Sequence, residues 1–194
     1  MKLDPRIVSD LALAFQPRAY LRVMPVAHMR KPLGMGFGHS RFSSPSQAFK
    51  LLYLARDLAT AIAETIVWDR FEGEIDRVLD EGEIENWAVA EVTATAPLTV
   101  LDLRTTGLLR LGVSTDAARA KEHREGRELS EAVYDPFAID GLLYASCLTA
   151  ADCVAVYDRA VSEKLTSSPA VELIRQADLL YALRSIGVSI RARR

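Results

Sequence analysis

Short apolar segments of strand length recur along the whole sequence, and segments with helical spacing fall between them at irregular intervals. This order predicts an α+β fold with a mixed, mainly antiparallel sheet and flanking helices, because a parallel βαβ array would alternate regularly. Strands are predicted at residues 19–26, 51–55, 86–95, 98–103, 141–146 and 153–158, and in VSIRA near the C-terminus. Helices are predicted at residues 4–15, after an Asp57 cap to about residue 71, and at 104–111, 115–134 and 175–186, with Gly187 as the last stop.

Length and composition indicate an ordinary globular protein. A chain of 194 residues suits one domain, and no repeat or composition shift divides it, so residues 1–194 are expected to form a single domain. The formal net charge of −2 argues against nucleic-acid binding by the whole surface, and no direct nucleic-acid partner is expected. Because charges interrupt the apolar N-terminal segment and no run of about 18 apolar residues occurs, we expect no membrane segment and a cytoplasmic location.

Glu64 is the most informative single residue. It is the only charged residue between Leu58 and Trp68, in a segment that is apolar on nearly every face of a helix. A helix of this kind is usually buried, and an ionised carboxylate there is costly unless it is paired or hydrogen-bonded. Glu64 is therefore either on one exposed stripe, near Thr60 and Phe71, or at the mouth of an apolar pocket with cationic partners.

Two arginines are candidates for binding a phosphate. Arg22 lies in a predicted strand, and Arg41 lies in the loop segment HSRFSSP, where hydroxyls and backbone N–H groups surround it. Either could also be an ordinary surface residue. The nearby glycines of GMGFG lack the G-x-G-x-x-G spacing between a strand and a helix, so they indicate a loop rather than a dinucleotide fingerprint.

Other common kinds of catalytic site have weak support. Ser146 lacks the G-x-S-x-G setting of a hydrolase nucleophile, and no histidine is placed by the sequence as its base. Cys147 and Cys153 form no metal-binding pattern, so no metal is expected. Tyr53 interrupts an aliphatic strand, where an aromatic ring is more often part of the core than a ligand platform.

The order of these features resembles the RES domain, the toxin half of Xre–RES toxin–antitoxin systems. The resemblance rests on YLR ending at Arg22, HSRFSSP around Arg41, LLYLARDLATAIAE ending at Glu64, and DGLLYAS ending at Ser146, and it covers roughly residues 18–190. It departs from the family where many members have Trp-Asn after the loop arginine, because this chain has Phe42-Ser43.

The resemblance implies a fold similar to ADP-ribosyltransferase toxins, with NAD⁺ as a substrate rather than a cofactor. It assigns the catalytic carboxylate to Glu64, the motif arginines to Arg22 and Arg41, the pocket aromatic to Tyr53 and the motif serine to Ser146. Cleavage of the nicotinamide–ribose bond develops positive charge on the ribose, which a carboxylate would stabilise. Arginines suit the pyrophosphate. Tyr53 would stack on a ring of NAD⁺, and Ser146 would bond the carboxamide or a ribose hydroxyl.

Three functions follow as alternatives. The first is a toxin that consumes NAD⁺ by hydrolysis or phosphorolysis, and the second is an ADP-ribosyltransferase acting on a host protein. No pair of acidic residues two apart occurs near Glu64, which favours the first. The third is a non-enzymatic nucleotide-binding or partner-binding module, which would not need Glu64. The resemblance also implies an Xre-type antitoxin with a helix-turn-helix domain as partner, inhibiting by inserting a segment into the pocket.

Overall fold

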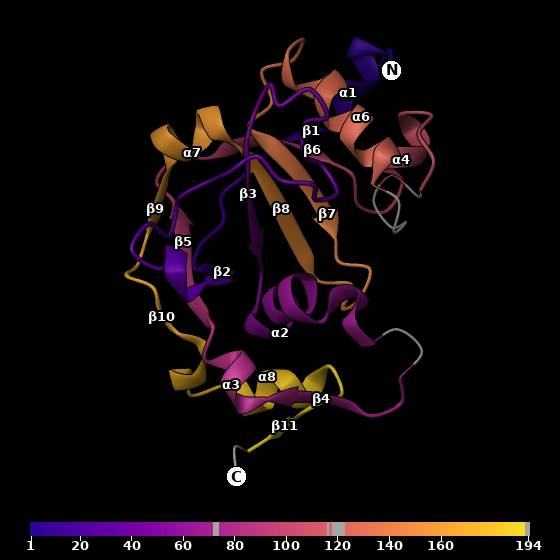
Figure 1. The fold of residues 1–194 in the computed structure, drawn as a ribbon. Helices are drawn as coiled ribbons and strands as arrows, with labels where there is room; N and C mark the ends of the chain where they lie inside the picture. The colour runs from indigo at the N-terminus through magenta and orange to yellow at the C-terminus, as the bar shows by residue number, and fades with distance from the viewer. Residues whose placement is uncertain (72–73, 116, 118–122, 193–194) are drawn as a thin grey trace.

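The computed structural model describes residues 1–71, 74–115, 117 and 123–192, and a curled sheet forms the centre of this part of the chain (Figure 1). The order of strands across it is β1-β6-β7-β8-β3-β2-β5-β10, and β9 also pairs with β5. The strands are β1 (Ala12–Phe15), β2 (Tyr20–Pro25), β3 (Leu51–Ala55), β5 (Trp87–Ala94), β6 (Leu98–Asp102), β7 (Gly141–Ala145), β8 (Asp152–Tyr157), β9 (Leu165–Ser167) and β10 (Val171–Glu172).

Most neighbouring strands in this sheet are antiparallel, and β6 with β7 is its parallel pair among the strands described for it. The longest ladder joins β2 to β5, from Tyr20 opposite Val92 to Pro25 opposite Trp87. The central strands β7 and β8 are almost wholly buried, which explains why their sequences are apolar without alternation. The predicted α+β fold with a mixed, mainly antiparallel sheet is confirmed.

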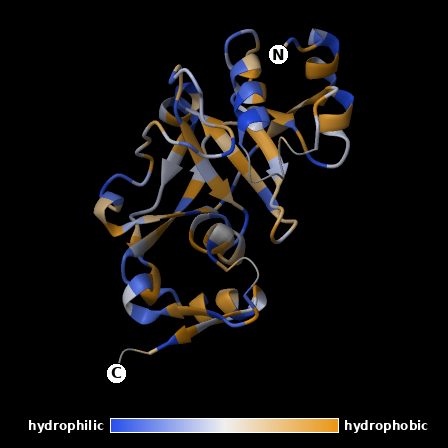
Figure 2. Cartoon of the chain, turned by 45° about the vertical axis from the view of Figure 1, so that its right-hand side comes forward, coloured by the Kyte–Doolittle hydropathy of each residue, from blue (hydrophilic) through white to orange (hydrophobic). Residues whose placement is uncertain are grey.

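Helices lie around the sheet and at one end of it (Figure 1). The helices carry both hydrophilic and hydrophobic residues, while the strands of the central sheet are mostly hydrophobic (Figure 2). The helices are α1 (Pro5–Leu11), α2 (Leu58–Ile62), α3 (Glu81–Ile84), α4 (Gly107–Arg110), α6 (Arg124–Tyr134), α7 (Asp158–Lys164) and α8 (Leu179–Ser185), with shorter turns η1 (Val26–His28), η2 (Ala63–Val67), η3 (Trp68–Phe71) and η4 (Leu173–Arg175).

A second, two-stranded sheet lies beyond α2, where β4 (Arg77–Asp80) and β11 (Val188–Arg191) pair in parallel (Figure 1). Helix α8 packs between this small sheet and α2. It ends before Gly187, whose φ of +70° is left-handed, as the predicted stop requires. None of the described helices is long and apolar enough to cross a membrane.

The predicted N-terminal helix over residues 4–15 is wrong in its second half. Asp4 accepts a hydrogen bond from the Arg6 N–H and α1 begins at Pro5, but the helix ends at Leu11 and Phe15 lies in β1. The reason is tertiary pairing, because Ala12–Phe15 forms a ladder with Leu98–Leu101 of β6.

Two further predictions need adjustment. The predicted helix over 115–134 corresponds to α6 in its second half, whereas residues 116 and 118–122 lie outside the described part of the chain. The predicted C-terminal helix over 175–186 divides into η4 and α8. The sequence analysis also missed several short elements, namely α3, α7, β4, β9 and β10.

Candidate functional site

Glu64 lies where α2 changes from an α-helix to a π-helical turn. The Asp57 carboxylate caps α2 by accepting a 2.8 Å hydrogen bond from the Thr60 N–H, as predicted. The following turn, η2 (Ala63–Val67), is π-helical, and such turns often occur at functional sites. Thr60 and Phe71 are 1% and 7% exposed, so the exposed stripe that would have carried Glu64 into solvent is not there. Glu64 is instead half-buried at a cavity.

Ser146 holds the carboxylate of Glu64 from behind. The Ser146 hydroxyl donates a 2.6 Å hydrogen bond to Glu64 Oε1, and its oxygen accepts two more, at 3.2 Å each, from the N–H groups of Leu148 and Thr149. Ser146 is only 3% exposed and is not among the cavity-lining residues. The structure therefore places Ser146 where its hydroxyl orients the carboxylate of Glu64. The ligand contact expected from the sequence stays a prediction.

The protonation of Glu64 is controlled by opposing effects. Burial raises the pKa of Glu64 above its ordinary value, and this is the largest effect. The hydrogen bond from Ser146 and the positive charge of Arg41 act in the opposite direction and favour the carboxylate. Glu64 is thus a partly desolvated acid with a fixed donor on one oxygen.

Arg41 is buried beside Glu64, although it comes from a loop. Its side chain is 5% exposed, its guanidinium carbon lies 4.6 Å from the centre of the Trp68 ring, and Nη2 lies 3.9 Å from Cys147 Sγ. The loop is pinned by Tyr53, whose hydroxyl oxygen accepts hydrogen bonds from Ser40 Oγ at 2.9 Å and from the Phe42 N–H at 3.1 Å. The predicted loop arginine is therefore fixed close to the predicted carboxylate.

Arg22 is a desolvated cation at the same cavity. Its guanidinium donates hydrogen bonds to the carbonyl oxygens of Pro32 and Gly34, the latter at 2.7 Å. Burial lowers the pKa of Arg22 to about 10. No carboxylate of the described residues forms an ion pair with it. These two carbonyl oxygens accept hydrogen bonds from Arg22 but carry no full negative charge to compensate its positive charge.

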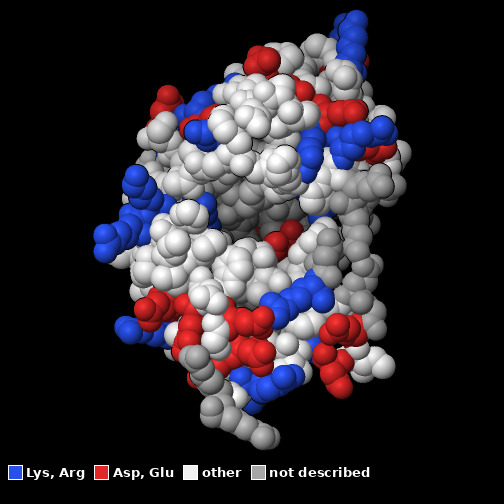
Figure 3. Space-filling model, viewed as in Figure 1, with Lys and Arg blue, Asp and Glu red and all other residues white. Residues whose placement is uncertain are grey.

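The predicted residues other than Ser146 meet at one cavity of about 430 Å³, a volume in the range of small-molecule sites. Its lining includes Arg22, Arg41, Tyr53, Glu64, Trp68 and His123. An adjoining hollow of about 210 Å³ shares Arg22, Ser40, Leu51 and Tyr53 with it. Figure 3 shows the molecular surface hollowed near its centre, with acidic atoms visible inside.

The cavity also contains residues that the sequence analysis did not select, namely Trp68, His123 and Tyr144. His123 gave no signal, because α6 lies far from Glu64 in the sequence. A larger hollow of about 820 Å³ lies along α2, α8 and the 148–151 segment, and it contains none of the predicted site residues.

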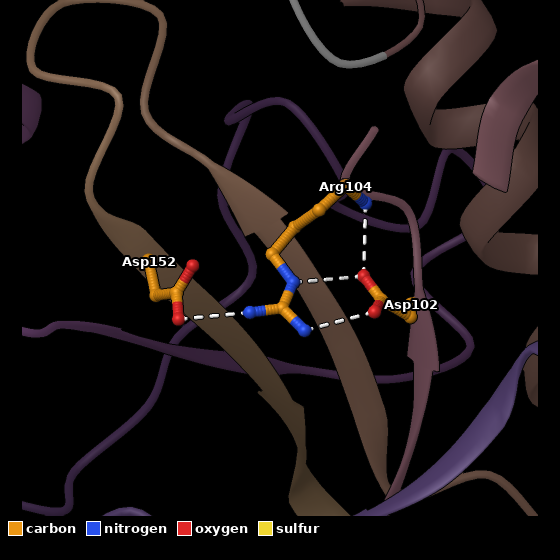
Figure 4. Close-up of polar contacts among 3 residues, drawn as sticks. All are labelled: Asp102, Arg104 and Asp152. Atoms are coloured by element: carbon orange, nitrogen blue, oxygen red, sulfur yellow. Dashed lines mark hydrogen bonds and ion pairs between the residues drawn. The ribbon is translucent and has the colours of Figure 1, made fainter. Parts of the chain in front are cut away.

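An ion-pair triad anchors the segment that carries Ser146 (Figure 4). The Arg104 guanidinium donates to both carboxylate oxygens of Asp102, at 2.9 Å each, and to Asp152 Oδ2 at 2.9 Å. Asp102 ends β6, and Asp152 begins β8 opposite Ala145, the residue before Ser146. The triad therefore joins the end of β6 to the start of β8, where the 146–151 loop returns to the sheet.

Comparisons with known proteins agree with this architecture. The "Probable toxin y4kH" of Sinorhizobium fredii (strain NBRC 101917 / NGR234) is 38% identical over 80 residues, which is 41% of this chain and 63% of that relative, so the match spans less than two thirds of its length. The crystal structure of the M. tuberculosis MbcT–MbcA toxin–antitoxin complex contains a similar fold, with a TM-score of 0.65 over 87% of this chain and 92% of that chain at 16% identity. The profile of the RES domain matches residues 17–176, most of the sequence, and the chain therefore belongs to the RES domain family.

Proposed function

We propose that this chain is the toxin of a toxin–antitoxin system and an enzyme that cleaves the nicotinamide–ribose bond of NAD⁺. One observation carries the proposal: a partly desolvated carboxylate, Glu64, is held by Ser146 at a cavity whose walls also contain Arg22 and Arg41. Membership of the RES family and the names of the two similar proteins support the toxin assignment.

The chemistry assigns a distinct role to Glu64. As the glycosidic bond breaks, nicotinamide leaves with the bonding electron pair and positive charge develops on the ribose. An ionised Glu64 close to that ribose would stabilise the charge where it develops, and a site from which water is partly excluded makes this effect larger. Ser146 holds one carboxylate oxygen still, so little reorganisation is needed during the reaction.

The two arginines suit the pyrophosphate of NAD⁺. Arg22 lines both the main cavity and the adjoining hollow, which fits a dinucleotide that extends across both. Because its charge is desolvated and has no carboxylate partner among the described residues, a bound phosphate would supply the missing negative charge. The Tyr53 ring, which borders both spaces, is placed to contact the ligand between them.

The test is NAD⁺ consumption by the purified protein, with and without phosphate, with products identified by mass spectrometry. Nicotinamide with ADP-ribose would indicate hydrolysis, and an ADP-ribose phosphate would indicate phosphorolysis. We expect Glu64→Gln to lower kcat by about 10²-fold or more, since the amide carries no charge. Glu85→Gln, on the exposed turn after α3, is the matched control and should keep full activity.

Two results would redirect the proposal. Labelling of an added protein without free ADP-ribose would indicate an ADP-ribosyltransferase, which shares the bond-breaking step. NAD⁺ binding with no turnover, unchanged by Glu64→Gln, would indicate a non-enzymatic nucleotide-binding module. The thermal unfolding temperature of the variant must be no lower than that of the wild type, so that lost activity does not simply report lost structure.

The proposal includes an antitoxin partner, because the solved structure with a similar fold is a complex of a toxin with its antitoxin. We expect an Xre-type protein with a helix-turn-helix domain that places a segment in the cavity and so excludes NAD⁺. Co-expression of such a protein should restore growth and reduce NAD⁺ loss. Continued toxicity in the presence of a stably bound partner would contradict inhibition at the cavity.

A further inference from the structure

The hollow that adjoins the main cavity is lined by a lysine that the proposed function does not use. This hollow of about 210 Å³ shares Arg22 and Tyr53 with the cavity. Of these two spaces, Lys50 lines only the hollow and Glu64 lines only the cavity. Arg22 therefore lies on the shared wall, between the part that contains Glu64 and the part that contains Lys50.

The order of these residues matches the order of groups along a dinucleotide. NAD⁺ runs from nicotinamide and its ribose, through the pyrophosphate, to the adenosine ribose and adenine. This inference rests on the proposed function above, in which the nicotinamide ribose lies at Glu64 and the pyrophosphate lies at Arg22. The next group along the ligand is the adenosine ribose, and the next part of the binding space is the hollow that contains Lys50.

Lys50 places a positive charge at the wall of the hollow. Its Nζ lies 4.8 Å from the centre of the Phe37 ring, which also lines the hollow. No carboxylate of the described residues forms an ion pair with it. The backbone at Lys50 is fixed, because its N–H donates to Asp158 Oδ2 and its carbonyl accepts from the Asp158 N–H, both at 3.0 Å. The charge is therefore available to a ligand and is carried by a fixed point of the chain.

The composition of the wall favours an anionic group. The described lining contains two cations, Arg22 and Lys50, and the hydroxyls of three serines, but no aspartate or glutamate. Glu131 accepts a 2.9 Å hydrogen bond from Ser44 but does not belong to the lining. In dinucleotide sites a carboxylate that bonds the 2′-hydroxyl of the adenosine ribose suits NAD⁺, whereas a cation there accommodates a 2′-phosphate. The hollow has the second arrangement.

We propose that Lys50 binds a phosphate on the 2′-oxygen of the adenosine ribose, so that the chain cleaves NADP⁺ as well as NAD⁺. In hydrolysis, nicotinamide leaves with the electron pair of the C1′–N bond, and the oxygen of a water molecule bonds to C1′. A proton of that water is released to solvent, and the second product is ADP-ribose 2′-phosphate. Lys50 determines the choice of substrate in this scheme, because it binds a part of the dinucleotide that does not react.

The test compares NADP⁺ and NAD⁺ as substrates of the purified full chain. Lys50→Gln removes a charged contact to the 2′-phosphate. It should lower the ratio of kcat/KM for NADP⁺ to that for NAD⁺ by about 10- to 100-fold, with the change in the KM for NADP⁺. Lys50→Arg keeps a phosphate-binding cation and should hold the ratio within about threefold of the wild-type ratio. Because both substrates are measured on one sample, the ratio does not depend on the folded fraction of a variant.

A binding measurement makes the result independent of catalysis. In calorimetry, ADP-ribose 2′-phosphate should bind the wild type about tenfold or more tightly than ADP-ribose, and Lys50→Gln should remove this difference. Lys31→Gln is the matched control for a general loss of positive charge, because Lys31 is an exposed lysine outside the lining. It should leave both the ratio and the binding preference unchanged.

The outcomes separate this inference from the proposed function. A wild type that cleaves NAD⁺ but not NADP⁺ would overturn the role of Lys50, and so would an unchanged ratio in Lys50→Gln. An equal fall for both substrates would also overturn it, since it would place Lys50 at the pyrophosphate that both dinucleotides share. A wild type that consumes neither dinucleotide would overturn the proposed function, and calorimetry with the two probes would then still test the 2′-phosphate site.

Discussion

The hydroxyl of Ser146 donates a 2.6 Å hydrogen bond to Glu64 Oε1, joining the start of the loop after β7 to the π-helical turn after α2. This contact explains how two residues separated by 82 positions act as one unit. It also shows how a serine can belong to the candidate site without being placed as a nucleophile, since its hydroxyl is fully engaged by its neighbours.

Ser146→Ala should impair catalysis through Glu64. Loss of the donor frees the carboxylate to move, and misplacement of a reacting group costs up to about 10²-fold, so kcat should fall about 10- to 100-fold. The hydrogen bond from Ser146 lowers the pKa of Glu64, so its removal should raise that pKa further. The acid limb of the kcat–pH profile should therefore move to higher pH. Ser189→Ala, at an exposed serine, is the control, and an unmoved acid limb would contradict the coupling.

Glu64→Gln should make stability less dependent on pH. Burial raises the pKa of Glu64 above its ordinary value of 4.5, so the folded protein binds this proton more tightly than the unfolded chain. Wild-type stability from this residue is therefore full below about pH 4.5 and falls as pH rises through the folded pKa. The glutamine side chain of the variant carries no ionisable proton, so this loss of stability with rising pH does not occur. The variant's Tm should equal the wild-type Tm near pH 4 and exceed it at pH 8, and the opposite trend would show a stabilising ion pair.

Part of this site could be predicted from the sequence because it depends on local signals. Glu64 was identified as a single charge in an apolar helical segment, and Asp57 as the helix cap before it. The strands of the central sheet were predicted because β3, β7 and β8 are continuous apolar runs. These features are set within a few residues of chain, which is the range over which periodicity and capping act.

The remainder depends on contacts between distant segments. β1 was predicted as helix because its pairing with β6, some 90 positions away, is invisible to local spacing. The hydrogen bond from Ser146 to Glu64 was not predicted, because the sequence does not show which distant side chain the hydroxyl meets. His123 enters the cavity only because α6 folds back on the loop of His39. Tertiary pairing overrides local preference at each of these positions.

Gly126→Ala should displace the loop that carries Arg41. A Cβ at Gly126 would lie 2.6 Å from the Arg41 carbonyl oxygen and 2.5 Å from that of Ala117, closer than a side-chain carbon approaches backbone atoms in proteins. We expect a loss of about 1–3 kcal/mol in the free energy of unfolding from overpacking, with a fall in NAD⁺ consumption. Gly82→Ala in α3 is the matched control, because its Cβ would meet nothing within 4 Å. Equal denaturation curves for the two variants would contradict the close approach.

Arg104→Gln should destabilise the edge of the sheet where β6 ends and β8 begins, next to the loop that carries Ser146. Its removal leaves Asp102 and Asp152 close together without the cation that holds both, and their side chains are only 22% and 21% exposed. Because the lost hydrogen bonds are charge-assisted and partly shielded from water, the free energy of unfolding should fall by about 1–3 kcal/mol. The matched control is Arg110→Gln, which breaks an exposed pair with Asp10 and should cost less than about 0.5 kcal/mol.

Urea denaturation of both variants measures the difference, and 0.5 M NaCl provides a second comparison. Salt screens the exposed Arg110 pair strongly, so any small effect of Arg110→Gln should vanish at high salt. The effect of Arg104→Gln should largely persist, because its three charge-assisted contacts are partly buried. Two results would contradict this role: an equal loss of stability in both variants, or a loss in Arg104→Gln that disappears at high salt. Either would show that the triad is an ordinary surface cluster that does not fix the loop carrying Ser146.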